Sequence, residues 1–220
     1  MPLKEANKWK QSIMNRKKIY VFDFDGTLTT SDTLLLFIRH VCGGWRMAAG
    51  FALYLPWLVL MKARLYPNYK AKQKVFAHFF GGMSVEEFDA HCRRFAEASG
   101  HIVRPKAAGY VADVAGGADA LVVVSASLDN WVRPMVERWL GAEGSAAAFT
   151  VVGTQPEVRG GRLTGRFATP NCYGAEKVRR LREVLPGDRQ QYFITAFGDS
   201  RGDKQLLEYA DEAHYKPFRD

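Results

Sequence analysis

The chain has 220 residues, of which 47% are hydrophobic and 25% charged, and its formal net charge at pH 7 is +8. This length and composition are typical of one globular domain that carries an insertion, and they exclude a disordered or collagen-like chain. Cys42, Cys92 and Cys172 are odd in number and far apart in the sequence. They favour free thiols in a reducing compartment over a disulfide framework.

The positive charge favours anionic partners, such as phosphates, nucleic acid or an anionic membrane face. No nucleic-acid-binding motif accompanies the charge, so we expect no nucleic acid partner. The basic N-terminus is not followed by the apolar stretch of a secretory signal. We therefore expect a cytoplasmic protein.

The first strongly β-prone run covers residues 19–25 and ends abruptly at Gly26-Thr27. The next segment, residues 32–104, shows only helical patterns and predicts an all-helical insertion, which we call the cap. Within it, Ser84-Val85-Glu86-Glu87 is a capping box that predicts a helix through about residue 98.

One segment of the cap, Met47–Met61, contains no charged residue and is flanked by Arg46, Lys62 and Arg64. It is too short, and with Pro56 too broken, to predict a transmembrane span. Two interpretations remain open. The segment is either the buried core of the cap, or an interfacial patch or apolar substrate channel whose basic flanks suit anionic lipid headgroups.

Strand and helix patterns alternate in the second half of the chain. Continuous apolar runs predict buried strands over residues 121–125, 149–152 and 192–197. Gly-rich turns predict a hairpin over residues 158–167. Helical periodicity covers residues 131–140 and 176–185. This alternation predicts an α/β protein with a Rossmann-like parallel sheet flanked by helices. We expect residues 1–31 and 105–220 to form this core and residues 32–104 to form the cap.

Polar motifs follow the predicted strands where parallel α/β proteins place their active sites. They are Asp23-Phe24-Asp25-Gly26-Thr27, Ser125, Lys177 at the start of a helix, and Gly198-Asp199-Ser200-Arg201-Gly202-Asp203. Each alone has a structural explanation, such as a turn, a helix cap or a surface lysine. Their combination in this order favours a catalytic site.

The combination resembles the haloacid dehalogenase superfamily of phosphohydrolases. DFDGT is similar to its first motif, the serine of VVVSAS to its second, the lysine of GAEKVRRL to its third and GDSRGD to its fourth. The helical insertion lies where the phosphoserine-phosphatase-like branch of that superfamily carries its cap. The resemblance implies the fold and a phosphoryl-transfer reaction.

By this resemblance, Asp23 is the nucleophile that forms an aspartyl-phosphate, and Asp25 is the general acid and base. An acid at position 25 favours phosphate transfer over dehalogenation. We expect the chain to turn sharply at Gly26, where a glycine suits the backbone of a tight turn. The residues implied in phosphate binding are Gly26, Thr27, Ser125 and Lys177.

The resemblance also implies Mg²⁺, because two carboxylates beside a phosphate need a hard cation. Its implied ligands are the carboxylates of Asp23 and Asp199 and the backbone carbonyl of Asp25. Asp203 is implied as a group that orients the metal waters and Lys177.

Two substrate classes remain open. Phosphoserine phosphatases carry a glutamate nine residues after the nucleophile and an arginine in the cap, whereas this chain has Asp32 and the basic residues Lys70, Lys72 and Lys74. Lysine is not an equivalent bidentate clamp for a carboxylate. The apolar segment 47–61 and the G-x-E-K third motif resemble instead the phosphatidylglycerophosphatase C family of bacteria. We therefore favour a lipid or other amphiphilic phosphate over a small soluble ester.

The apolar segment 47–61 also predicts peripheral contact with the inner membrane face. It leaves a non-enzymatic alternative, a membrane adaptor built on an inactive phosphatase scaffold. The presence of all the implied catalytic side chains favours the enzyme.

Overall fold

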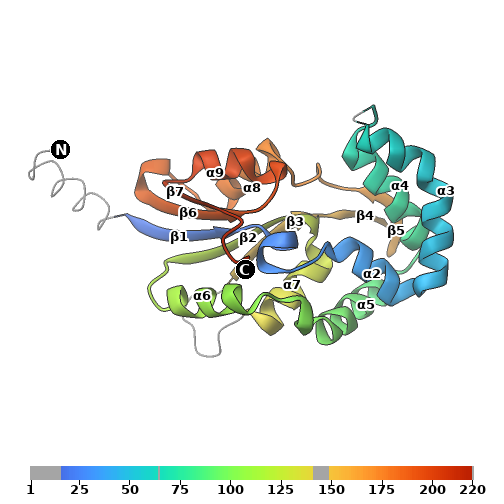
Figure 1. Ribbon diagram of the computed structural model, residues 1–220, viewed down its shortest axis with the longest axis horizontal. Coiled ribbons are helices and arrows are strands. Elements are labelled where there is room, and N and C mark those ends of the chain that lie inside the picture. The colour runs from blue at the N-terminus through green and yellow to red at the C-terminus, as the bar shows by residue number, and fades with distance from the viewer. Residues whose placement is uncertain (1–15, 64, 141–148, 220) are drawn as a thin grey trace, which may run out of the picture.

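The computed structural model describes residues 16–63, 65–140 and 149–219. Within these residues, parallel strands form a five-stranded sheet in the order β3-β2-β1-β6-β7 (Figure 1). The strands are β1 (Lys17–Phe22), β2 (Ala120–Leu128), β3 (Phe149–Thr154), β6 (Tyr192–Gly198) and β7 (Glu212–Tyr215). The α/β prediction is confirmed. Strand β7 was not predicted.

Helices cover both faces of the sheet, as the continuous apolar strands require (Figure 1). Along β2, Leu121 and Val123 belong to one core cluster and Val122 and Val124 to the other. Two helices pack with the first cluster, α6 (Pro105–Ala115) and α7 (Asp129–Trp139). Two others pack with the second cluster, α8 (Ala175–Val184) and α9 (Lys204–Tyr209).

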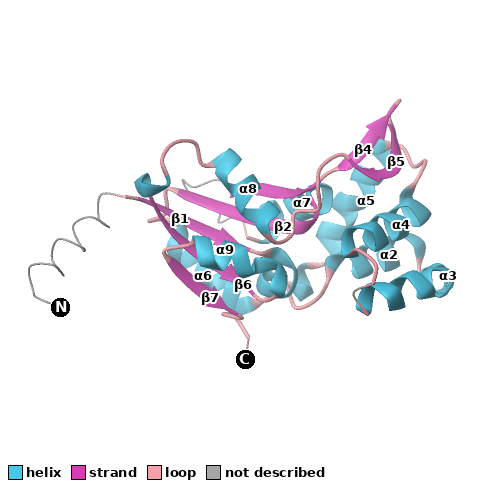
Figure 2. Cartoon of the chain, turned by 90° about the horizontal axis from the view of Figure 1, so that it is seen from above, coloured by secondary structure: helices cyan, strands magenta, loops and turns pink. Residues whose placement is uncertain are grey.

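The chain leaves β1 through a turn over Phe24–Leu28 and enters the cap. The cap helices are α2 (Thr33–Cys42), α3 (Gly44–Lys62), α4 (Asn68–Phe80) and α5 (Val85–Ala98). Figure 2 shows them grouped beyond the end of the sheet opposite the start of β1. The capping box is confirmed, since Ser84 Oγ accepts a hydrogen bond from the Glu87 amide at 3.2 Å. Short 3₁₀ turns cover Gly100–Ile102, Arg189–Gln191 and Arg201–Asp203.

Aromatic packing joins the cap to the core. Phe37 of α2 is fully buried, and its ring stacks on Trp131 of α7 with 4.8 Å between centroids. Phe80 and Phe88, from α4 and α5, contact the same Phe37 ring at 5.3 and 5.5 Å. One cluster therefore connects three cap helices with a helix of the sheet domain.

A hairpin of β4 (Pro156–Arg159) and β5 (Arg162–Phe167) lies beside the cap (Figure 2), although the sequence places it between core elements. Leu163 exchanges backbone hydrogen bonds with the α4–α5 loop, accepting from Gly82 at 2.8 Å and donating to Met83 at 2.9 Å. At Gly165, a Cβ would lie 2.7 Å from the Ala77 Cβ, and φ is +82°. A glycine is therefore needed where β5 crosses α4.

The apolar segment 47–61 is not the buried core of the cap, because most of helix α3 is exposed or partly buried. It continues through Pro56, so the segment is one unbroken helix, and only Gly50 in it is buried. Partly buried Phe51, Tyr54 and Leu58 pack on the core cluster, while the remaining apolar side is exposed. Among the described residues, no helix has the length and apolar character needed to cross a bilayer.

We expect Phe37→Ala to lower the free energy of unfolding by about 3–5 kcal/mol, because it empties the centre of the aromatic cluster. Leu35→Ala is the control, since Leu35 is on the same helix but 44% exposed. It should change the free energy by less than about 0.5 kcal/mol. Urea unfolding measures both. Equal losses in the two variants would mean that the cluster does not hold the cap.

Candidate active site

A cavity of about 620 Å³ lies at the carboxyl ends of β1, β2 and β6, between the sheet and the cap. Strand β1 lies between β2 and β6. The chain therefore builds the sheet outward from β1 in both directions, with β2 and β3 on one side and β6 and β7 on the other. Such a switch point opens a crevice at the strand ends, where open α/β sheets bind ligands. The predicted residues that line the cavity are Asp23, Asp25, Gly26, Asp32, Lys177 and Asp199.

The turn after β1 brings Asp23 and Asp25 to this one cavity. Gly26 has φ +82°, and a Cβ there would lie 2.5 Å from Asp199 Oδ2. Only glycine therefore suits both the backbone conformation and the close approach of Asp199. Thr27 is buried and donates a hydrogen bond from Oγ1 to Asp23 Oδ2 at 3.1 Å. The predicted sharp turn is present.

Lys177 is buried between two carboxylates. Its Nζ lies 2.5 Å from Asp23 Oδ1 and 2.6 Å from Asp203 Oδ1. Burial opposes the charged form of Lys177, but Asp23 and Asp203 outweigh it and hold the lysine pKa above its ordinary value. Burial raises the pKa of Asp23 to about 7, an effect that Lys177 opposes. The lysine is the cation that favours the anionic form of Asp23.

Asp203 and Ser200 form a tight turn after β6. Asp203 Oδ2 accepts hydrogen bonds from the amides of Asp199 (3.1 Å) and Ser200 (2.9 Å) and from Ser200 Oγ (2.8 Å). Burial raises the pKa of Asp203, but Lys177 and Ser200 outweigh it and hold the pKa below its ordinary value. Asp199 is half-buried, and its Oδ2 accepts from Arg219 at 2.5 Å.

These carboxylates suit a hard divalent cation. Oxygen atoms of Asp23, Asp199 and Asp203 all lie within 4.8 Å of one another. Both oxygens of Asp203 already accept hydrogen bonds. Mg²⁺ prefers oxygen ligands, and all three carboxylates are close enough together to face one such ion.

Asp25 is held by hydroxyl groups from two other elements. Its Oδ1 accepts hydrogen bonds from the amide and the hydroxyl of Thr33, at 2.8 and 2.6 Å. Its Oδ2 accepts from Ser127 Oγ at 2.6 Å. Burial, followed by the nearby charge of Asp32, raises the Asp25 pKa above its ordinary value. Thr33 and Ser127 were missed in the sequence. Thr33 lies in none of the four motifs, and Ser127 is the second serine of VVVSAS, in which only Ser125 was given a role.

Ser125 and Asp32 make hydrogen bonds that the sequence did not predict. Ser125 is completely buried, and its Oγ accepts a hydrogen bond from the Ser127 amide at 3.0 Å. Ala126 and Ser127, rather than Ser125, line the cavity. Asp32 lines the cavity but also caps α2, since its Oδ1 accepts from the Leu34 amide at 2.9 Å.

Two further cations lie at the cavity, Lys72 from the cap and Arg219 from the end of the described chain. Lys72 Nζ donates to the Ala126 carbonyl at 2.5 Å. Burial lowers the Lys72 pKa, while Asp25 and Asp32 oppose that effect. Lys72 is one of the cap lysines noted in the sequence, with Lys70 and Lys74, whereas Arg219 lies in no sequence motif.

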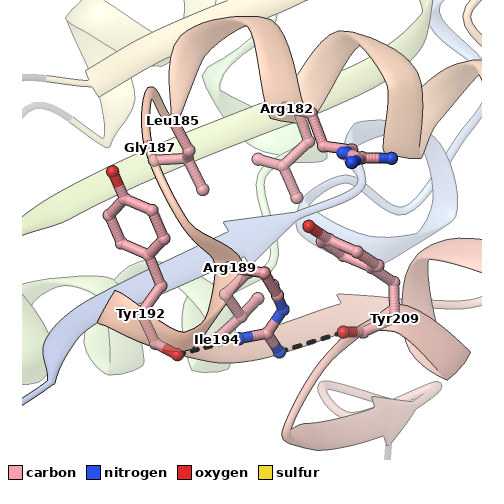
Figure 3. A pocket seen from close by; sticks show the side chains of 8 residues that line it. Arg182, Leu185, Gly187, Arg189, Tyr192, Ile194 and Tyr209 are labelled. Atoms are coloured by element: carbon pink, nitrogen blue, oxygen red, sulfur yellow. Dashed lines mark hydrogen bonds between the residues drawn. The ribbon is translucent and has the colours of Figure 1, made fainter.

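A second, smaller cavity of about 220 Å³ lies where β6 begins, at the end of the strand opposite the active site (Figure 3). Figure 3 shows the Arg189 guanidinium bonded to the carbonyls of Tyr192 and Tyr209, at 2.8 and 3.0 Å. It also donates to Asp211. These contacts give Arg189 a structural role.

Comparison with known proteins gives relatives over most of the chain. Protein CicA of Caulobacter vibrioides is 34% identical over 205 residues, which cover 91% of this chain and 86% of that protein. A protein of unknown function from Bordetella pertussis Tohama I has the same fold, with a TM-score of 0.73, 18% identity and coverage of 90% of this chain and 89% of its own.

A phosphoserine phosphatase, solved as a phospho-aspartyl intermediate analogue, has a TM-score of 0.58 and 18% identity over 90% of this chain and 85% of its own. At such identities the structural likeness shows the fold alone. The sequence itself matches the haloacid dehalogenase-like hydrolases over residues 20–208. This range contains all four predicted motifs, and the chain belongs to the haloacid dehalogenase-like hydrolase family.

Proposed function

We propose that the protein is a Mg²⁺-dependent phosphomonoester hydrolase that carries the phosphoryl group on Asp23. The observation behind this proposal is that Asp23 and Asp25 line one cavity, directly before the turn at Gly26. A buried nucleophile paired with a cation, with a second carboxyl beside it, is what two-step phosphoryl transfer requires.

In the first step, a carboxylate oxygen of Asp23 attacks phosphorus and the bond from phosphorus to the ester oxygen breaks. Asp25 gives a proton to that oxygen, and the alcohol leaves. Lys177 favours the anionic form of Asp23, and beside the incoming phosphate its charge would offset that of the phosphoryl oxygens. The backbone of the β2 end, at Ala126 and Ser127, lines the same cavity.

In the second step, Asp25 takes a proton from a water molecule, whose oxygen attacks phosphorus. The bond between phosphorus and Asp23 breaks, inorganic phosphate leaves, and both carboxyl groups return to their starting states. Asp23, Asp199 and the backbone carbonyl of Asp25 are the groups that would hold Mg²⁺. The cation would supply positive charge against the phosphoryl oxygens.

We propose an amphiphilic phosphate as the substrate, because one wall of the cavity is apolar. The apolar residues that line the cavity together with the carboxylates include Phe51, Leu58 and Met61 of α3 and Leu34 and Leu35 of α2. A phosphate group at Asp23 would place an attached acyl chain along this wall.

The outer side of α3 supports contact with a membrane surface. Its exposed apolar residues define what we call the α3 patch, which comprises Trp45, Leu53, Leu55, Trp57, Val59 and Leu60. A solvent-facing helix with so many apolar residues is typical of interfacial helices, in which tryptophans lie at the headgroup level.

The charges around the α3 patch favour an anionic lipid face. Residues 33–83 contain no Asp or Glu. The basic residues in this range are Arg39, Arg46, Lys62, Arg64, Lys70, Lys72 and Lys74. Each basic residue near an anionic bilayer contributes about 1 kcal/mol of attraction. The proposed setting is therefore the cytoplasmic side of the inner membrane, reached by peripheral contact.

A small soluble ester such as phosphoserine is the second candidate. Asp32 favours it, because this carboxylate lines the cavity and could pair with a substrate amine.

We expect Asp23→Asn to lower phosphate release from p-nitrophenyl phosphate on the order of 10⁴-fold, because the amide is not a nucleophile. Asp113→Asn, at an exposed position of α6, is the control and should keep full activity. Radiolabelled phosphate should attach to the unaltered protein and not to the Asp23 variant. A membrane adaptor would show no turnover in any of these proteins.

We expect chelation with EDTA to abolish activity and added Mg²⁺ to restore it. Asp199→Asn removes one carboxylate ligand and should raise the Mg²⁺ concentration for half-maximal activity by about 10- to 100-fold. The concentration is measured by titrating metal into chelator-treated protein, with Asp113→Asn as the reference. Full activity in EDTA would contradict the metal assignment.

We expect hydrolysis of phosphatidylglycerophosphate in anionic vesicles to exceed that of soluble phosphoserine. Leu53→Glu places a charge in the α3 patch and should lower the rate of lipid hydrolysis by about tenfold, because the exposed leucine would no longer be available to insert into the bilayer. The rate with p-nitrophenyl phosphate should not change. Val158→Glu, at an exposed apolar residue of β4, is the matched control. A preference for phosphoserine, unaffected by Leu53→Glu, would favour the soluble ester.

A further inference from the structure

A buried chain of hydrogen bonds runs from Asp25 to the indole of Trp131. Thr33 Oγ1 lies 2.6 Å from Asp25 Oδ1, and Trp131 Nε1 donates to the same Thr33 Oγ1 at 3.0 Å. Thr33 and Trp131 are both completely buried. Asp25 is thus connected to α7, on the sheet side of the molecule, through the first turn of α2.

The indole fixes the direction of the Thr33 hydroxyl. An indole N–H can only donate, so Thr33 Oγ1 has to accept from Trp131, while its one hydrogen remains to be donated. Two acceptors are within reach, Asp25 Oδ1 at 2.6 Å and Ser127 Oγ at 3.4 Å. The shorter contact, to a charged acceptor, is the stronger one.

We propose that Trp131 is a positioning residue for the general acid, acting through Thr33. This inference rests on the proposed function, in which Asp25 delivers a proton to the leaving oxygen. Proton delivery needs the carboxyl held within hydrogen-bond reach of that oxygen. Without the indole N–H, the Thr33 hydroxyl is free to rotate toward Ser127, and Asp25 loses one of the donors that fix its orientation.

The packing role of Trp131 can be separated from this role. Its ring stacks on Phe37, and Trp131→Phe retains an aromatic ring there while removing the N–H. Trp139 provides a matched control on the same helix, because its Nε1 donates to the Ala96 carbonyl at 2.6 Å. Trp139→Phe removes an equivalent donor that has no connection to Asp25.

The test compares kcat/KM for two esters of similar shape, p-nitrophenyl phosphate and benzyl phosphate. The nitrophenolate leaves without a proton, whereas the benzyl alkoxide needs one from Asp25. Trp131→Phe should lower kcat/KM for benzyl phosphate by about tenfold and leave that for p-nitrophenyl phosphate within about twofold. Trp139→Phe should affect neither ester selectively.

A double-mutant cycle with Thr33→Val tests whether the effect passes through Thr33. Thr33→Val alone should show the same selectivity for benzyl phosphate, and adding Trp131→Phe to it should cause no further loss. Equal losses on both esters, no loss on either, or additive losses would each overturn the inference. Absence of Asp23-dependent hydrolysis in the unaltered protein would instead overturn the proposed function, and the inference with it.

Discussion

The buried ammonium of Lys177 is the interaction on which the active site depends. It lies within 2.6 Å of both Asp23 and Asp203, and all three side chains are nearly excluded from solvent. Buried charges are tolerated only when they are paired, so the loss of one member would leave an uncompensated charge inside the protein. The triad therefore holds β1, α8 and the turn after β6 at one point, and its lysine favours the anionic form of Asp23 against the effect of burial.

The sheet order explains why these elements meet. Strand β1 lies between β2 and β6, and the carboxyl ends of parallel strands open on one side of the sheet. At that edge two carboxyl groups, Asp23 and Asp25, follow β1 and line one cavity. The positive φ of Gly26 lets the chain turn directly after them, and the absence of a side chain there leaves room for Asp199.

Helix α3 contributes to two surfaces at once. One side packs on the cap core and walls the cavity through Phe51 and Leu58, and the other side is apolar and exposed. The hairpin β4–β5 is hydrogen-bonded to the α4–α5 loop, and Phe37 stacks on Trp131 of the sheet domain. The cap is thus tied to the core by packing as well as by its two chain connections.

The sequence by itself determined the fold class, the family and the four motifs, because each motif is a short run of neighbouring residues in or after a buried strand or, for Lys177, at the start of a helix. Only the tertiary structure decided which groups hold Asp25. Ser127 lies 102 residues from Asp25 in the chain, and Thr33 lies eight residues away beyond the turn. Their hydrogen bonds depend on how helices and strands pack, and neither Thr33 nor the second serine of VVVSAS shows in the sequence which carboxylate it meets. The exposure of residues 47–61 also depends on the tertiary structure. An apolar helix is expected to pack against something, but only the positions of the other cap helices decide which of its sides is covered.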